Sequence, residues 1–431
     1  MKVALLGSGG RECALAWKIS QSSLLEKLYI LPGNAGTINY GENINIKVTD
    51  FKSIENFVKK EKIDVLVVGP EVPLVEGIVD FLYKKIQKKD LLIIGPNKQA
   101  SALEGSKDFA KAFMQKNNIP TANYKSFNKD NIKEGFSFLD SLTPPYVLKA
   151  DGLAAGKGVL IIDDLKQAKK ELSLMIKNKK FGKASNKVVI EEFLKGTEIS
   201  VFVLTDGESY KILPHAKDYK RIFEKDKGPN TGGMGAISPV PFCDRFFLDK
   251  VENVIIKPTI KGLKDIGIKY QGFIFFGLIV VGKEPYVIEY NVRLGDPETE
   301  VILPRIKSDI LDLFLGIKNN TFSEKDVFIN NESAATIMLV SDGYPDKYEK
   351  NKVIKNLDLI KDSLVFHAGT KVKNQDVLSN GGRVIAVTSK GKDLETALRK
   401  AYFDAGQIDF ENKFFRKDIG QDIIKNKSID S

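Results

Sequence analysis

The sequence predicts a multidomain α/β protein, α+β in part, whose N-terminal region holds a parallel sheet. The chain has 431 residues, more than a single hydrophobic core usually organises. Its first part alternates short apolar runs with amphipathic stretches, a pattern typical of β-α-β units. Hydrophobic residues make up 42% and charged residues 28% of the chain, which favours a folded globular protein over a disordered or fibrous one.

The N-terminal domain, which we assign to residues 1–105, is predicted from its regularly spaced apolar runs. Because parallel strands need crossover helices between them, the alternation predicts a Rossmann-like parallel sheet. Glycine-containing turns follow the first two runs, and such a sheet binds its ligands beyond the carboxyl ends of its strands. The predicted strands are Val3–Leu6, Leu28–Leu31, Val65–Val68 and Leu92–Ile94.

A second domain, residues 106–325, begins where the pattern changes to a predicted helix at Lys107–Lys116. The apolar run at 272–281 (GFIFFGLIVV) is far shorter than the roughly 20 residues of a membrane-spanning helix, so it predicts a buried strand. A polar loop is expected at Asp218–Gly235. The predicted strands are Tyr146–Lys149, Val188–Ile190, Ile199–Leu204, Phe273–Val281 and Pro285–Glu289.

The C-terminal domain, residues 326–431, is expected to be small and mixed. Strands are predicted at Thr336–Val340 and Arg383–Val387, and a helix at Leu394–Phe403. No fixed-period repeat or low-complexity tract interrupts the sequence. The chain is therefore expected to hold three units, each large enough to bury an apolar interior.

Composition narrows the possible partners. The formal net charge is +10, but the lysines are scattered and no aromatic residues are interleaved with them, so no nucleic-acid partner is predicted. No signal sequence and no membrane partner are predicted either. The two cysteines, Cys13 and Cys243, lack disulfide or metal-ligand spacing, which favours a cytoplasmic location. Binding of small anionic substrates would explain the positive net charge equally well.

A glycine-rich loop at Lys149–Gly158 (KADGLAAGKG) follows a predicted strand. Glycines let backbone amides approach phosphate oxygens, and Lys149 and Lys157 add positive charge. The loop lacks the GxxxxGK[ST] pattern of a Walker A motif, and a flexible surface hairpin is the alternative interpretation.

The strand end at Val188–Leu194 (VVIEEFL) has the features of an adenine slot. Its backbone could pair with the edge of a purine while Phe193 and Leu194 cover the flat face, and Glu198 could accept from ribose hydroxyls. The alternative is a strand that ends at a solvated acidic turn.

The segment Val287–Glu300 (VIEYNVRLGDPETE) predicts a metal site. The period of two along a strand places Glu289, Asn291 and Arg293 on one face. Carboxylate and amide oxygens suit Mg²⁺, and an arginine can hold an anion with two parallel hydrogen bonds. Asp296 and Glu298 add acidic groups nearby, while a simple ionic ladder is the alternative.

Taken together, these motifs resemble the phosphoribosylamine-glycine ligases, a family of ATP-grasp enzymes. The matching blocks run in order through nearly the whole chain: GSGGRE, PGNAGT, VGPEVPLVEGIVD, LEGSK, KADGLAAGKG, EEFLKGTE, GPNTGGMGAISP, EYNVRLGDPET, FHAGT, GGRV and FRKDIG. The resemblance implies a pre-ATP-grasp N-terminal domain, two ATP-grasp lobes around ATP, and a small C-terminal domain. It also implies a reaction that joins glycine to 5-phosphoribosylamine through glycyl phosphate, with release of ADP and phosphate, in purine biosynthesis.

The resemblance implies roles for individual residues. ATP would contact Lys107, Lys149, Gly152, Ala155, Gly156, Lys157, Gly158, Glu191, Phe193, Leu194 and Glu198. Mg²⁺, or Mn²⁺ in its place, would bind to Glu289 and Asn291. The two other substrates would contact Gly9, Gly10, Arg11, Asn34, Asp218, Lys220, Asn230, Thr231, Arg293, Asp296, Pro297 and Glu298. The catalytic residues would be Arg293, Lys149 and Asp296.

The sequence departs from the family pattern at two places. The usual histidine after GSGGRE is Cys13, and the usual QDHKR reads KDYKR, with Lys217 and Tyr219 in place of glutamine and histidine. Both departures concern expected substrate contacts, so no general base is assigned to the Asp218–Gly235 loop. A monomer is expected, with a dimer as the alternative.

Two other enzyme classes are compatible with parts of the sequence. A related purine-pathway ATP-grasp ligase would act on formate or bicarbonate in place of glycine. A dinucleotide-dependent oxidoreductase would explain the N-terminal sheet, but GSGGRE is not a full GxGxxG motif, and no acidic residue marks a ribose contact.

Overall fold

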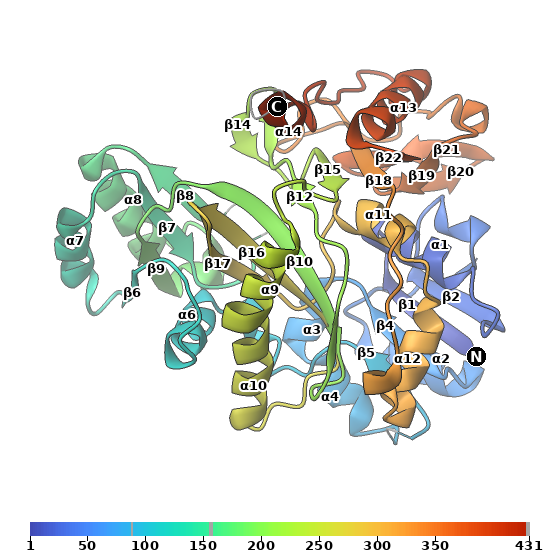
Figure 1. Cartoon of the computed structure of the whole chain (residues 1–431), viewed down its shortest axis with the longest axis horizontal. Coiled ribbons are helices and arrows are strands. Elements are labelled where there is room, and N and C mark those ends of the chain that lie inside the picture. Colours follow the sequence, from blue (N-terminus) through green and yellow to red (C-terminus); the bar gives the residue numbers. More distant parts are fainter. Residues whose placement is uncertain (88, 155–157, 428–431) are drawn as a thin grey trace.

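The computed structural model describes residues 1–87, 89–154 and 158–427. It confirms the predicted α/β class, with a parallel sheet in the N-terminal domain and antiparallel sheets in the rest of the described chain. Figure 1 shows the N-terminal elements in blue on one side, a teal lobe projecting from the opposite side, and the red C-terminal elements above. None of the helices in these ranges is long and apolar enough to cross a membrane.

The N-terminal sheet has the strand order β3-β2-β1-β4-β5, and all its neighbouring strands are parallel. The four predicted strands are present, and the short β3 is added at one edge. Because β1 is central, the glycine-rich turn after it lies in the middle of the carboxyl edge of the sheet. The elements are β1 (Lys2–Gly7), α1 (Gly10–Ile19), β2 (Lys27–Pro32), β3 (Glu42–Asn43), α2 (Phe51–Glu61), β4 (Val65–Val68), α3 (Glu71–Glu76), α4 (Ile78–Tyr83) and β5 (Leu92–Ile94).

A small lobe follows two connecting helices. Its antiparallel sheet has the order β6-β9-β7-β8 and is packed against α7 and α8. Buried residues such as Phe127, Leu148 and Leu172 form a hydrophobic core that is separate from the two larger cores. The elements are α5 (Ala102–Gly105), α6 (Lys107–Lys116), β6 (Tyr124–Asn128), α7 (Ile132–Ser141), β7 (Tyr146–Ala150), β8 (Val159–Ile162), α8 (Leu165–Lys177) and β9 (Lys187–Glu191).

A large lobe is built on the antiparallel sheet β11-β10-β16-β17. The apolar run at 272–281 is the central strand β16, whose first eight residues are buried, as the sequence predicts. Helices α9 and α10 cover this sheet and share a hydrophobic core with the N-terminal domain. The elements are β10 (Thr197–Thr205), β11 (Tyr210–Ile212), α9 (Arg245–Val251), α10 (Lys257–Asp265), β16 (Gly272–Val281) and β17 (Glu284–Asn291).

The C-terminal sheet, β12-β15-β18-β22-β19, takes two strands from the predicted polar loop region. The prediction of one loop at Asp218–Gly235 is therefore wrong: the segment ends β12, contains the hairpin β13–β14 and begins β15. The elements are β12 (Lys217–Asp218), β13 (Arg221–Phe223), β14 (Lys227–Asn230), β15 (Gly235–Ser238), α11 (Thr299–Ile302), α12 (Ile310–Asn319), β18 (Ser333–Val340), β19 (Leu364–His367), β20 (Thr370–Lys373), β21 (Asp376–Ser379), β22 (Arg383–Gly391), α13 (Leu394–Gln407) and α14 (Gln421–Lys427).

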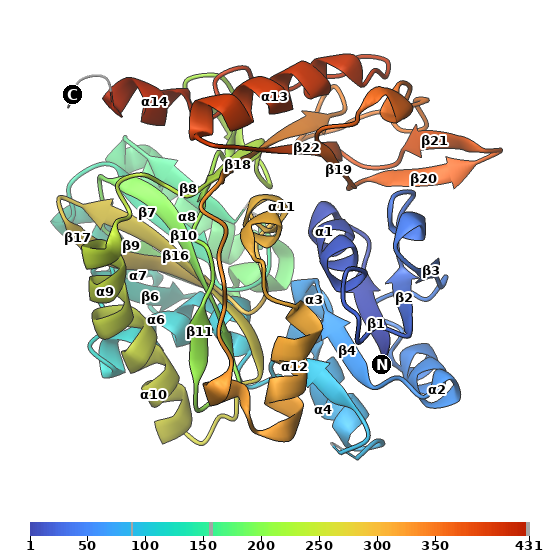
Figure 2. The ribbon, with the colours of Figure 1, turned by 45° about the vertical axis from the view of Figure 1, so that its right-hand side comes forward.

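The C-terminal sheet packs against the N-terminal domain. Figure 2 shows β19 and β22 lying above α1. Buried residues of α1, including Cys13 and Ala16, share one core with Phe366 and Val387, and the rings of Trp17 and Phe366 lie 5.8 Å apart. The sheet thus joins chain segments on both sides of the predicted boundary at residue 325, so that boundary does not separate two independent sheets.

Candidate active site

Side chains from both lobes meet near the ends of β7, β9 and β17. Lys107 begins α6, whose first turn is fixed because the Ser106 side chain accepts a backbone hydrogen bond at 3.1 Å. Lys107 Nζ donates to the carbonyl oxygen of Gly152 at 3.2 Å. Lys149 Nζ donates to the carbonyl oxygen of Ile288 at 3.4 Å. The two lysines are therefore held close to the strand that carries the predicted metal ligands.

The Glu289 carboxylate lies among positive charges, but it makes no ion pair or hydrogen bond with any residue that the structure describes. Burial raises the pKa of Glu289, yet Lys220, Lys149 and Lys107 lower it by more, so the net pKa lies below the usual value. Glu289 is therefore ionised at neutral pH, and its oxygens remain available to a ligand.

Asn291 is buried at the end of β17 and contacts the predicted anion-binding arginine. Arg293 Nη2 donates to Asn291 Oδ1 at 3.1 Å. Arg293 also lies 2.9 Å from a Glu104 carboxylate oxygen, and its Nε lies 3.5 Å from Glu71 Oε2. Arg293 is thus paired with carboxylates from the N-terminal side of the molecule, not with Glu289.

The pair Glu289 and Asn291 fits a hard divalent cation such as Mg²⁺. Glu289 offers a carboxylate that pairs with none of the described residues, and the Oδ1 of Asn291, which accepts from Arg293 Nη2, is the amide oxygen beside it. No group of three or more His, Cys, Asp or Glu residues suited to a metal occurs in the same ranges. Mg²⁺ commonly takes only one or two protein oxygens and completes its coordination with water and phosphate.

The predicted phosphate loop is described only at its two ends. The Ala150 amide donates to the carbonyl oxygen of Gly158 at 2.8 Å, which closes the base of the loop. Gly152 has a φ of +155°, and a Cβ there would lie 2.8 Å from the Ala184 Cβ, so the position requires glycine. Outside the described residues lie Ala155, Gly156 and Lys157.

The residues predicted to contact adenosine lie at the end of β9, at the start of β10 and on the segment that joins them. Glu191 is buried at the end of β9. Phe193 is 39% exposed and Leu194 is partly exposed, so both remain open to a flat ligand. Glu198 Oε2 accepts a hydrogen bond from Lys220 Nζ at 2.6 Å. Phe193 and Leu194 could therefore cover the face of a flat ligand, next to the ion pair of Glu198 and Lys220.

The predicted substrate residues of the hairpin β13–β14 are tied to its base. The Thr231 amide and hydroxyl both donate to the carbonyl oxygen of Lys220, each at 2.7 Å. Asn230 is paired with Arg221 across the hairpin. These contacts hold the hairpin next to Glu198 and the end of the large-lobe sheet.

The turn that carries Asp296 and Pro297 is held by the C-terminal domain. Arg383, at the start of β22, lies 2.9 Å from Asp296 Oδ1 and donates to the Asp296 carbonyl oxygen at 2.7 Å. The same guanidinium donates to the carbonyl oxygen of Gly232 at 2.6 Å. Gly233 packs against Pro297, and a Cβ there would lie 2.4 Å from Pro297 Cδ. One arginine therefore joins three segments that border the site.

Glu298 is buried, and the half-buried carboxylate of Asp218 lies close enough to affect its charge. Burial and the Asp218 charge together raise the pKa of Glu298 to about 7, against the opposite effects of Lys220 and of Ser200, whose Oγ donates to Glu298 Oε1 at 3.0 Å. Burial also raises the pKa of Asp218, against the attraction of Lys220. Because the two carboxylates disfavour each other's ionisation, the pair holds a proton close to neutral pH.

The N-terminal turn contacts the acidic turn that follows β17. The Gly9 amide donates to Glu12 Oε2 at 2.7 Å, and Arg11 Nε pairs with Glu12 Oε1 at 2.7 Å. Arg11 also donates through Nη1 to the carbonyl oxygen of Leu294 at 3.2 Å, and its amide lies 3.4 Å from Asp296 Oδ2. The predicted residues Gly9 and Arg11 are thus brought next to the acidic turn after β17.

Asn34 joins the N-terminal turn to the C-terminal domain. Its Nδ2 donates to the Ser8 carbonyl oxygen at 2.9 Å and to the His367 carbonyl oxygen at 2.7 Å. Gly10 packs on Glu300, and a Cβ at Gly10 would lie 2.3 Å from Glu300 Oε1. The thiol of Cys13, where the family has histidine, is buried nearby, and burial raises its pKa to about 12. Cys13 is therefore a neutral thiol that cannot act as a cation at this position.

Sequence reasoning gave no role to several residues that contact the site, although signals were present. Arg383 lies within the quoted block GGRV, and Glu104 within LEGSK. Lys111 follows Lys107 by one helical turn and therefore faces the same side of α6. Ser200 gave no signal, because a lone serine on an apolar strand is ordinary.

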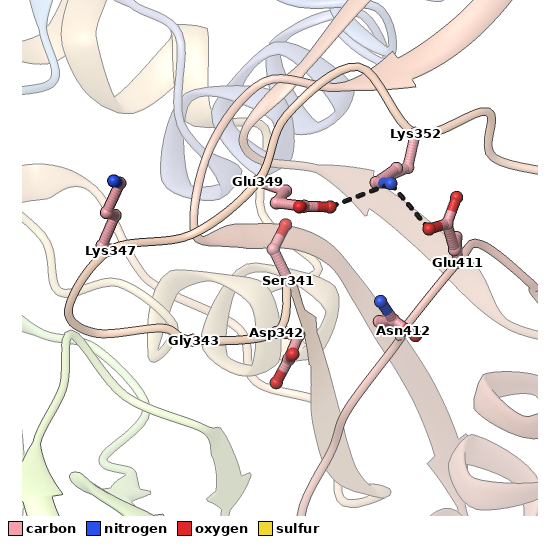
Figure 3. A pocket seen from close by; sticks show the side chains of 8 residues that line it. All are labelled: Ser341, Asp342, Gly343, Lys347, Glu349, Lys352, Glu411 and Asn412. Carbon is pink, nitrogen blue, oxygen red and sulfur yellow. Dashed lines mark hydrogen bonds and ion pairs between the residues drawn. The ribbon is translucent and has the colours of Figure 1, made fainter.

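A separate cavity of about 150 Å³ lies in the C-terminal domain. Figure 3 shows Lys352 between two carboxylates, 2.9 Å from Glu349 and 2.7 Å from Glu411. The lining residues are Ser341, Asp342, Gly343, Lys347, Glu349, Lys352, Glu411 and Asn412. None of the predicted site residues lines it, and both glutamates are already paired with Lys352, so we assign it no role.

The small lobe and the large lobe, whose charged side chains meet at the ends of β7, β9 and β17, define the class of fold. The structure is similar to the biotin carboxylase from Campylobacter jejuni, solved as a β,γ-ATP complex, with a TM-score of 0.71 and 15% identity, over 96% of this chain and 92% of that chain. At this identity the likeness shows a shared fold. It is also similar to the phosphoribosylamine-glycine ligase from Thermotoga maritima, with a TM-score of 0.83 and 34% identity, over 97% of this chain and 100% of that chain.

Sequence comparison identifies the family. Residues 1–104, 105–299 and 334–422 match the models of the N domain, the ATP-grasp (A) domain and the C domain of phosphoribosylglycinamide synthetase. The phosphoribosylamine-glycine ligase of Fusobacterium nucleatum subsp. nucleatum is 45% identical over 426 residues, which cover 97% of this chain and 98% of that protein. The chain belongs to the phosphoribosylglycinamide synthetase family.

Proposed function

We propose that this chain joins glycine to 5-phosphoribosylamine using ATP, and so forms glycinamide ribonucleotide, ADP and phosphate in purine biosynthesis. The family match through all three domains supports this assignment. The observation that carries it is the set of three lysines, Lys107, Lys149 and Lys220, placed around the carboxylate of Glu289, which pairs with no residue in the described part of the chain. Such a site suits the phosphates of a nucleotide and a divalent cation.

The proposed chemistry has two steps. A carboxylate oxygen of glycine attacks the γ-phosphorus of ATP, the bond to the β-phosphate oxygen breaks, and glycyl phosphate and ADP form. The amine of phosphoribosylamine then attacks the acyl carbon, the amine nitrogen loses a proton, and phosphate leaves. Because the first step brings two anions together, Lys107 and Lys149 would act by holding the phosphates and neutralising their charge.

Mg²⁺ or Mn²⁺ would be held by Glu289 and Asn291, and would add positive charge at the phosphate oxygens. Arg293, Asp296 and Glu298 would border glycine and the acyl phosphate, with the hairpin β13–β14 beside them. The turn at Gly9–Arg11 would face phosphoribosylamine. The separate core of the small lobe supports its closing as a unit over ATP, which would keep water from the acyl phosphate. We also propose that the enzyme acts as a cytoplasmic monomer.

The test is an assay of ADP release with each substrate omitted in turn. Purified enzyme with MgATP should release ADP at a sustained rate only when glycine and phosphoribosylamine are both present. Replacing glycine by formate or bicarbonate should return the rate to background. Equal ADP release without glycine, or release only with another carboxylate, would refute the glycine assignment and favour a related ATP-grasp ligase.

A further inference from the structure

Lys111 is a buried cation to which the proposed reaction gives no role. It lies on α6, one turn after Lys107, and its side chain is 2% exposed. Its Nζ lies 3.0 Å from Glu191 Oε2 and donates to Thr121 Oγ1 at 2.7 Å. Because lysine is almost never fully buried unless it is paired, these two contacts define its place in the structure.

Glu191 is held by two lysines through one of its oxygens only. Lys149 Nζ also lies 3.0 Å from Glu191 Oε2, so both cations converge on the same atom. The other oxygen, Oε1, is buried and has no hydrogen-bond partner among the described residues. A buried acceptor without a partner is unfavourable, which makes Oε1 a candidate for contact with a ligand.

Among the direct contacts, the two lysines Lys111 and Lys149 meet one carboxylate, that of Glu191, so these contacts carry an excess of positive charge. Burial and the charge of Lys149 lower the pKa of Lys111, Glu191 and Glu192 raise it, and the net pKa is about 8. The Tyr124 ring, 5.6 Å from Lys111 Nζ, supplies a weak additional contact. An anion next to Lys149, such as a nucleotide phosphate, would balance this excess.

Lys111 also connects the carboxylate to the strand of the proposed metal ligands. Thr121 Oγ1, which accepts from Lys111, donates to the carbonyl oxygen of Val287 at 2.7 Å. The Val287 amide in turn donates to the carbonyl oxygen of Pro120 at 2.8 Å. Val287 lies on β17, two residues before Glu289. Lys111 therefore fixes Glu191, on the small lobe, relative to the large-lobe strand that ends in the site.

We propose that Lys111 is a positioning residue for the nucleotide. It holds Glu191 by Oε2, so that Oε1 stays directed toward the nucleotide as an acceptor and Lys149 is shared between Glu191 and phosphate. Lys111 itself does not contact the nucleotide. This inference rests on the proposed use of ATP, and it adds a residue that acts through Glu191.

The test is the affinity for MgADP, measured by isothermal titration calorimetry. Lys111→Met should raise the dissociation constant about tenfold, which corresponds to losing one hydrogen bond to a charged group. Lys111→Arg keeps the charge and should restore most of the affinity. Lys116→Met removes a lysine from the exposed end of the same helix, and should leave the affinity within about twofold of the wild type, a difference under 0.5 kcal/mol.

A double-mutant cycle separates positioning from a merely structural role. If Lys111 acts through Glu191, adding Lys111→Met to Glu191→Gln should weaken MgADP binding little beyond Glu191→Gln alone. Additive losses of affinity would overturn the proposal. So would an unchanged dissociation constant in folded Lys111→Met, even with a lowered melting temperature. If Lys111→Met does not fold, Lys111→Arg and Lys111→Gln in the same cycle decide the question.

This experiment is independent of the second and third substrates. A Lys111-dependent affinity for MgADP without glycine-dependent ADP release would refute the proposed function but retain the role of Lys111. Normal ligase activity with an affinity for MgADP that is insensitive to Lys111 would refute the role of Lys111 but retain the proposed function.

Discussion

At the scale of single residues, Glu289 determines the charge balance of the site. It is an ionised carboxylate among Lys107, Lys149 and Lys220, without an ion-pair partner in the described chain. A carboxylate surrounded by lysines either stabilises the folded protein by balancing their charge or binds a ligand. The two roles predict different results when the charge is removed.

Glu289→Gln should lower kcat at least about 100-fold, the usual size of a lost electrostatic contact in a transition state. Its melting temperature should change by no more than about 3 °C, which corresponds to roughly 1 kcal/mol. Steady-state kinetics and thermal unfolding measure the two effects. Glu284→Gln, at the exposed start of the same strand, is the matched control and should leave both unchanged. Proportionate loss of activity and stability would instead indicate a structural ion pair.

His215 predicts how stability depends on pH. Burial lowers its pKa to about 4, with a smaller effect of Arg305, and its Nε2 accepts from the Val240 amide at 3.2 Å. In the unfolded chain the pKa is about 6.5. Between these values the unfolded state binds more protons, so the stabilisation is complete above about pH 6.5 and is lost as the pH falls toward 4.

His215→Gln should therefore lose less stability than the wild type on acidification. Between pH 7 and pH 5 the difference in the free energy of unfolding should be about 2 kcal/mol, from a proton uptake that begins near 6.5. Urea unfolding at the two pH values measures it. His367, whose pKa burial also lowers to about 4, remains in the variant and keeps part of the dependence. Identical losses in both proteins would contradict the assignment.

The sequence predicted the role of a residue where its neighbours in the site are also its neighbours in the chain. It missed residues whose partners lie far away in the chain. Glu289 and Asn291 were predicted as neighbours because the period of a strand sets their spacing. Arg383 was not assigned, since its partners Asp296 and Gly232 lie on other domains, and only the fold brings them together. The contact between Arg293 and Glu104 was missed for the same reason.

At the scale of elements, the apolar strands were predicted well and the polar ones were not. β16 is a continuous apolar run, so its burial follows from its composition. The hairpin β13–β14 and the short strands beside it contain lysines, glycines and a proline, and they lack apolar alternation. Among the described strands, β13 and β14 pair only with each other, and β12 joins a sheet only through β15, which pairs with β18 far along the chain, so the segment had the pattern of a loop.

Gly233 tests how closely this segment must approach the acidic turn. Its φ is +116°, and a Cβ would overlap Pro297, so alanine would be strained and would push the turn away. Gly233→Ala should lower kcat/KM at least about tenfold, because shifts of about 1 Å in a site are costly.

Gly406→Ala is the matched control for this variant. Gly406 lies on α13, where a Cβ would meet open space, so alanine should be neutral or slightly stabilising. Comparison of kcat/KM and melting temperature in the two variants separates a local effect from a general one. Wild-type activity in Gly233→Ala would show that the close approach is not needed.

At the scale of the whole molecule, the small lobe is the part with its own core, whereas the N-terminal, large-lobe and C-terminal elements share two cores. The sequence predicted three units but could not show this sharing, because packing between distant segments leaves no local pattern. A ligand that contacts both lobes should therefore restrict the small lobe most.

Hydrogen exchange followed by mass spectrometry tests this expectation. MgADP should slow exchange in β7 and β9, which carry Lys149 and Glu191, and leave α13 unchanged. Slowing confined to the N-terminal sheet would contradict a nucleotide site between the lobes and would favour a dinucleotide site at the GSGGRE turn.

The central claim is that a carboxylate oxygen of glycine becomes bonded to the γ-phosphorus of ATP. The most direct measurement uses glycine labelled with ¹⁸O in its carboxylate, with mass analysis of the phosphate released when MgATP and phosphoribosylamine are also present. The account predicts one ¹⁸O atom in each phosphate, because the acyl-phosphate oxygen leaves with phosphorus when the amine attacks carbon. Phosphate without the label would contradict it.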